Sequence, residues 1–137
     1  MKRGAVLFSA WLMTGLPDAL AAPADAGDCP PPPPGAQGIV DGPVRAAWQP
    51  EPAPLLVGQP FALRVTLCPR DAQLLRVDAS MPEHRHGMNY RPSIQDLGAG
   101  VWRAEGLLWH MSGRWELRLD VQSQGASYRL VQSVLLP

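Results

Sequence analysis

The chain has 137 residues, a length that allows one domain rather than two. It carries 12 basic and 12 acidic side chains, and this lack of a basic surplus argues against a nucleic-acid-binding protein. Hydrophobic residues make up 46% of the chain, which is enough to form a core. Three histidines, five methionines and two cysteines are then the residues whose positions carry most information about function.

Residues 1–21 have the features of a secretory signal peptide. The stretch begins with two basic residues and continues as an apolar run of roughly 12 residues, which is too short to span a bilayer as a helix. It ends on the small-x-small pattern that a signal peptidase accepts, and we expect cleavage after Ala21. The mature protein is therefore expected to be periplasmic or secreted and not membrane-spanning.

Residues 22–38 form a proline-rich N-terminal segment with five consecutive prolines at 30–34, a pattern that favours an extended chain. Cys29 precedes these prolines, and Cys68 is the other cysteine of the chain. Because an exported protein meets an oxidising compartment, we expect a disulfide between Cys29 and Cys68. The alternative is a thiolate metal site.

Residues 39–137 contain short runs in which apolar and polar side chains alternate, with turns between the runs. The alternation is that of half-buried strands. The runs lie at residues 44–48, 61–67, 75–80, 101–109, 115–121 and 128–135. No stretch has a helical stripe of apolar residues. Six or seven strands at this spacing predict an all-β fold, a single immunoglobulin-like antiparallel β-sandwich of about seven strands.

After the signal peptide is removed, all histidines and methionines fall in two short segments. The first segment is the connection after the run at 75–80, and the second is the end of the run at 101–109. The residues are Met81, His84, His86, Met88, His110 and Met111. In an extended backbone, residues two apart point the same way, so His84, His86 and Met88 are expected on one side. Antiparallel pairing could bring the second segment to the same rim.

Imidazole and thioether together form a soft, neutral ligand set, and Cu(I) is the metal that most prefers it. Zinc would normally recruit cysteine or carboxylate as well, and calcium or magnesium would need several oxygen ligands. The six residues therefore predict a copper site. In the alternative interpretation the methionines fill gaps in the core. The loop would then be a metal-free recognition surface with polar contacts from Arg85, Asn89, Tyr90 and Arg91.

Motifs for catalysis are lacking. The sequence has no glycine-rich phosphate loop, no G-x-S-x-G and no carboxylate pair beside a histidine. We therefore expect a protein that is not an enzyme and that holds or hands over the ion.

The pattern M-P-x-H-x-H-G-M at residues 81–88 is followed by G-L-L at 106–108, H-M at 110–111 and G-R-W-E-L at 113–117. Over roughly residues 40–135 the chain resembles the YtkA-like domain family, which overlaps in pattern with FixH-like proteins. The resemblance implies an immunoglobulin-like sandwich outside the cytoplasm and a role in copper handling, including copper delivery during assembly of cytochrome oxidases. It also implies that Met81, His84, His86 and Met88 are metal positions.

Two functions thus remain as hypotheses. The first is a periplasmic copper-binding protein that holds Cu(I) in the Met/His loop or passes it to or from an envelope protein. The second is a metal-independent immunoglobulin-like adaptor, or an accessory domain, that binds another envelope protein.

Overall fold

The computed structural model describes residues 29–137, so the predicted signal peptide and its cleavage site lie outside the described residues. These residues form nine strands and one turn of 3-10 helix, η2, at Pro82–His84. The strands are β1 (Gln37–Asp41), β2 (Val44–Glu51), β3 (Pro60–Cys68), β4 (Gln73–Met81), β5 (His86–Gly87), β6 (Ser93–Gly98), β7 (Val101–Leu108), β8 (Gly113–Ser123) and β9 (Ala126–Leu136). No helix of residues 29–137 is long and apolar enough to cross a membrane.

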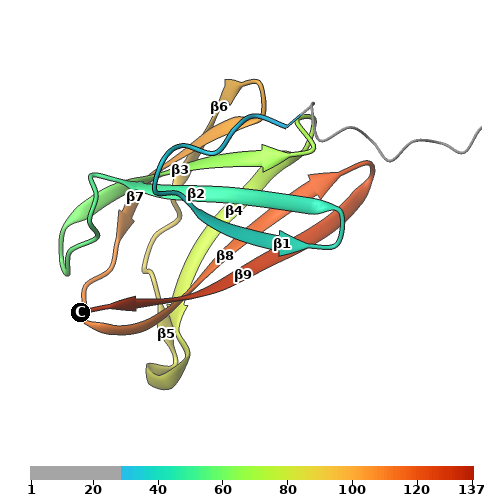
Figure 1. Ribbon diagram of the computed structural model, residues 1–137. Coiled ribbons are helices and arrows are strands. Elements are labelled where there is room, and N and C mark those ends of the chain that lie inside the picture. The colour runs from blue at the N-terminus through green and yellow to red at the C-terminus, as the bar shows by residue number, and fades with distance from the viewer. Residues whose placement is uncertain (1–28) are drawn as a thin grey trace, which may run out of the picture.

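The strands form two antiparallel sheets that pack face to face (Figure 1). One sheet has the order β1-β2-β3-β7-β6 and the other the order β5-β4-β8-β9. The order β2-β3-β7-β6 opposite β4-β8-β9 is the A-B-E-D and C-F-G arrangement of an immunoglobulin sandwich. The predicted all-β immunoglobulin-like sandwich is confirmed.

Three of the nine strands are not among the predicted runs, namely β1, β5 and β6. In β6 all side chains except that of Ile94 are exposed, and in β1 only Ile39 is buried. Strand β5 has two residues. All three lie at sheet edges, where a strand is held by backbone pairing and needs little apolar alternation to form.

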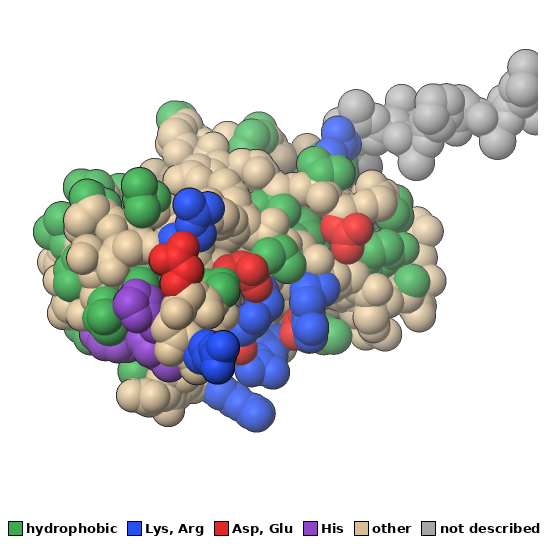
Figure 2. Space-filling model, turned by 90° about the horizontal axis from the view of Figure 1, so that it is seen from below, with side chains coloured by type: hydrophobic (Ala, Val, Ile, Leu, Met, Phe, Trp, Pro, Cys, Tyr) green, Lys and Arg blue, Asp and Glu red, His purple; other side chains and the backbone are tan. Residues whose placement is uncertain are grey.

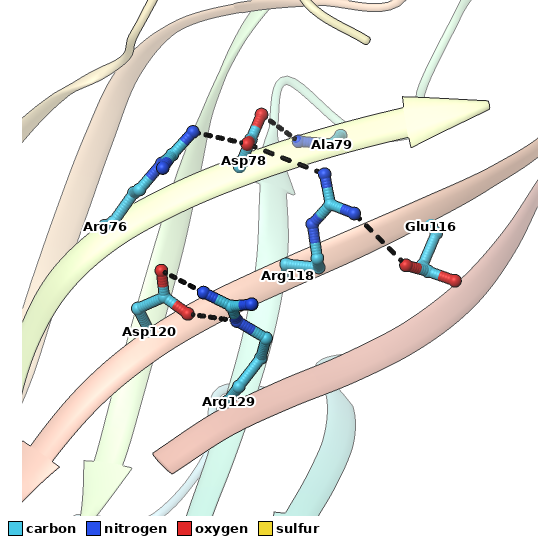
Figure 3. A network of polar contacts seen from close by, with 7 residues as sticks. All are labelled: Arg76, Asp78, Ala79, Glu116, Arg118, Asp120 and Arg129. Atoms are coloured by element: carbon cyan, nitrogen blue, oxygen red, sulfur yellow. Dashed lines mark hydrogen bonds and ion pairs between the residues drawn. The ribbon is translucent and has the colours of Figure 1, made fainter. Parts of the chain in front are cut away.

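Strand β8 shows how the alternation in the sequence builds the core. Four inward-facing side chains of β8 are fully buried: Trp115, Leu117, Leu119 and Val121. The outward side chains form ion pairs across the sheet, because Arg118 lies opposite Asp78 of β4 and Asp120 lies opposite Arg129 of β9 (Figure 3). One face of this sheet is therefore apolar and the other is charged.

The predicted disulfide is present and joins Cys29 to Cys68, whose Cα atoms lie 5.1 Å apart. Cys68 is the last residue of β3, so the bond fastens the proline-rich segment to the five-stranded sheet. Because no free cysteine is found in residues 29–137, the alternative of a thiolate metal site is wrong for these two residues.

Candidate metal centre

The two segments that carry the histidines and methionines meet at one end of the sandwich. Strand β4 ends at Met81, and the chain then turns through η2 and returns as β5, which projects from that end in Figure 1. Strands β4 and β8 are antiparallel neighbours in which Ser80 lies opposite Glu116. The start of β8, and with it the connection from β7 at residues 109–112, therefore lies beside the end of β4.

The connection after β4 does not have the extended backbone predicted for His84, His86 and Met88. Pro82 starts the 3-10 turn, and Arg85 ends it in the left-handed conformation with φ of 55°. Proline at the first helical position favours this turn, since its fixed φ suits a helix and its missing N–H is not needed there. His84 therefore lies in a helical turn, and only His86 continues in a strand, paired with Met81.

The structure brings all three histidine rings of the chain together. The ring centroid of His86 lies 5.9 Å from that of His84 and 5.1 Å from that of His110, with interplanar angles of 37° and 32°. His86 is half-buried, and it lies between the exposed side chains of His84 and His110. We call these three residues the histidine row. Figure 2 shows the histidine side chains side by side on one face of the molecule.

Two buried tryptophans lie beneath the histidine row. The ring of Trp115 meets His86 and His110 edge-on, with centroid distances of 6.2 and 5.7 Å. Trp115 also stacks on Trp109 at 5.2 Å, with an interplanar angle of 7°. Its indole N–H donates to the Met111 carbonyl at 2.9 Å. The tryptophans thus form a rigid support for the row and fix the backbone of the second segment.

The contact between Trp115 and the histidines was not predicted. The alternating pattern identified Trp115 as a core residue, and it is indeed buried. A signal for the contact is present in the sequence, because Trp115 follows His110 by five residues, across the short connection that begins β8.

The three methionines differ in how far they are exposed. Met81 is 1% exposed, and its methyl carbon lies 3.0 Å from the position that a Cβ on Gly113 would occupy. Met88 and Met111 are half-buried and pack against the edge of the core. The backbone N–H of Met88 donates to the Ala79 carbonyl at 3.1 Å, which ties this residue to β4. Met88 and Met111 are thus the more accessible thioethers.

Acidic residues contribute little to the cluster. The carboxylate of Glu83, the acidic residue next to His84, lies 3.6 Å from the Arg114 guanidinium. In the described part of the chain, no group of three or more His, Cys, Asp or Glu side chains is arranged to hold a metal ion. The structure therefore shows the three imidazoles as neighbours and not as a closed site of those four residue types.

Comparison of the chain with protein-family models, with curated proteins and with solved structures found no match.

Proposed function

We propose that this protein binds Cu(I) through the histidine row and the neighbouring methionines, and that it holds the ion or passes it to an envelope protein. The observation that carries the proposal is the spacing of the rings, 5.9 and 5.1 Å between centroids. Metal–imidazole bonds are about 2 Å long, so two rings that share one ion have centroids no more than about 6 Å apart. Both pairs in the row lie within that range.

The ligand chemistry favours copper in its reduced state. The residues on hand are imidazoles and the accessible thioethers of Met88 and Met111, which suit the soft Cu(I) ion. We assign His86 and His110 as the central pair, because they are the closest two rings and both are supported by Trp115. His84 and the thioethers would complete the set, and Met81 would join only after leaving the core. The role proposed is that of a carrier and not of an enzyme.

Two further observations support the placement of this function outside the cytoplasm. The Cys29–Cys68 disulfide is typical of exported proteins, and residues 1–21 have the pattern of a signal peptide. The resemblance of residues 81–88 to the YtkA-like pattern agrees with copper handling.

A competition experiment tests the proposal. The mature chain is titrated with Cu(I) against a colorimetric chelator, and we expect it to withdraw copper from the chelator. The double substitution His86→Gln, His110→Gln is expected to weaken the affinity for Cu(I) by about tenfold or more, since two ligands are lost. Asn89→Ala, an exposed change in the same loop, is the matched control and should leave the affinity unchanged. A chain that never competes, or a double variant with unchanged affinity, would overturn the proposal.

The pH dependence of binding separates the two ligand types. Protons compete with a metal for imidazole but not for thioether sulfur. Lowering the pH from about 7.5 to about 5 is therefore expected to weaken copper binding by the wild type more than binding by the His86→Gln, His110→Gln variant. An equal loss in both proteins would show that these histidines are not ligands.

The second candidate is a metal-independent adaptor that binds another envelope protein. It is favoured by the packing of the methionines against the core, which gives them a role without metal. Capture of a partner from envelope extract, with a strong copper chelator present throughout, distinguishes the two. An adaptor keeps its partner in the chelator, whereas a partner that requires copper is lost.

A further inference from the structure

A hollow of about 420 Å³ lies next to the histidine row, between the outward face of β4 and β8 and the connection at residues 85–91. His86 and Met88 lie on its border. Its charged lining consists of Arg76, Asp78, Arg85, Arg91 and Arg118. The hollow is therefore positive, with four guanidinium groups and one carboxylate.

This concentration of charge is specific to the hollow. Residues 29–137 contain ten arginines and nine carboxylate side chains, so the described chain as a whole is nearly neutral. Lys2, the only lysine, lies outside the described residues. The blue side chains beside the histidines in Figure 2 are thus arginines. Four of the ten gather around one hollow that holds only one of the nine carboxylates.

Asp78 holds two of these arginines in place. One oxygen of its carboxylate lies 2.7 Å from a nitrogen of Arg76 and 3.5 Å from a nitrogen of Arg118 (Figure 3). Arg118 also pairs with Glu116 at 3.3 Å. Each guanidinium has five N–H donors, and these contacts use only part of them. The sheet side of the hollow therefore keeps donors for a ligand.

The other two arginines are on the loop side. Arg85 and Arg91 are exposed, and neither forms an ion pair or side-chain hydrogen bond with another residue of the described range 29–137. Tyr90 lies between them in sequence, and its hydroxyl donates to the Leu108 carbonyl at 3.0 Å. That bond fastens the loop to the end of β7. The loop thus presents two guanidiniums that have no ion-pair partner within residues 29–137, and its backbone is tethered.

We propose that this hollow binds a small multivalent oxyanion, of the polycarboxylate or phosphate class. The planar fork of a guanidinium forms paired hydrogen bonds with either group. Arg85 and Arg91 would bind the anion from the loop, and Arg76 and Arg118 would bind it from the sheet. The volume lies in the range of small-molecule sites. The site requires no metal, so it stands apart from the copper proposal although the two adjoin at His86.

The test uses the full mature chain, freed of metal, and follows binding by calorimetry and by NMR shifts of the loop amides. Citrate and inorganic phosphate are the probes, and acetate is the monovalent comparison. We expect saturable 1:1 binding of citrate or phosphate, about tenfold or more tighter than that of acetate. Binding of one probe but not the other identifies which of the two sources supplies the oxyanion.

Matched double variants show whether the hollow itself is responsible. Arg85→Gln with Arg91→Gln is expected to weaken binding about tenfold or more. Arg64→Gln with Arg129→Gln removes the same charge from residues that do not line the hollow and should change binding less than about twofold. Equal losses in the two double variants would overturn the proposal, since the attraction would then be general. Failure of both probes to saturate would also overturn it.

The two proposals can fail separately. Cu(I) affinity of the Arg85→Gln, Arg91→Gln variant is expected to equal that of the wild type. If the wild type does not bind Cu(I), only the copper proposal is overturned, because the anion titration is carried out on metal-free protein.

Discussion

Gly113, the first residue of β8, connects the fold to the candidate metal centre at the scale of a single residue. Its φ is +121°, and a Cβ there would lie 3.0 Å from the methyl carbon of Met81. Gly113→Ala is expected to lower the free energy of unfolding by about 1–3 kcal/mol, because it combines backbone strain with a close contact in the core. Urea denaturation measures this difference.

Gly38→Ala is the matched control for that measurement. Gly38 lies in β1, and a Cβ there would have nothing within 4 Å. The change is expected to alter stability by no more than about 0.5 kcal/mol. Similar losses in both variants would contradict the account of Gly113.

At the scale of an element, the connection between β5 and β6 depends on Tyr90. Burial raises the pKa of the Tyr90 phenol above 10.0, so the hydroxyl keeps its proton and donates to the Leu108 carbonyl. Tyr90→Phe removes this bond. Because Tyr90 is 42% exposed, the expected loss at neutral pH is small, about 0.5 kcal/mol, with faster amide exchange at residues 88–91.

The raised pKa of Tyr90 also fixes the sign of a pH effect. The neutral phenol is the form favoured by folding, so its contribution to stability is present below pH 10 and is lost as the pH rises through the raised pKa. Wild type and Tyr90→Phe should therefore differ in stability at about pH 7, with wild type the more stable, and the difference should shrink as the pH is raised above 10. A difference that does not shrink at alkaline pH would contradict this role.

Strand β8 could be predicted because the burial of its side chains alternates. In β8 every second side chain is buried, and the sequence pattern follows it directly. Strands β1, β5 and β6 could not be predicted, because edge strands are held mainly by backbone pairing. The turn at Pro82–His84 was also missed, since the spacing of His84, His86 and Met88 fits an extended chain equally well and only the position of Pro82 hints at a turn.

At the scale of the whole molecule, the candidate site was predictable as a set of residues but not as a geometry. His110 could be expected near His84 and His86, because antiparallel strands return to the same rim. The support from Trp115 and the gathering of arginines at the hollow depend on which strands are neighbours. Arg118 reaches the hollow only because β8 pairs with β4, a contact between residues about 40 apart in sequence.

The disulfide and the histidine row lie at opposite ends of the molecule. Cys68 ends β3, shortly before β4 begins, whereas the row follows the far end of β4. Nine residues of strand separate the two ends of β4, which is roughly 25 Å. Stability and ligand binding should therefore respond separately to loss of the disulfide.

Replacing both Cys29 and Cys68 with Ser is expected to lower the free energy of unfolding by up to about 4 kcal/mol. The disulfide closes a loop across a sequence separation of 39 residues and so restricts the unfolded chain. Cu(I) affinity should change less than about twofold, because the site is distant. Thiol reduction of the wild type should reproduce the loss and leave the variant unaffected. A variant as stable as the wild type would show that the proline-rich segment does not depend on this disulfide for its attachment. A loss of copper binding in the variant would show that the disulfide and the histidine row are coupled through β4.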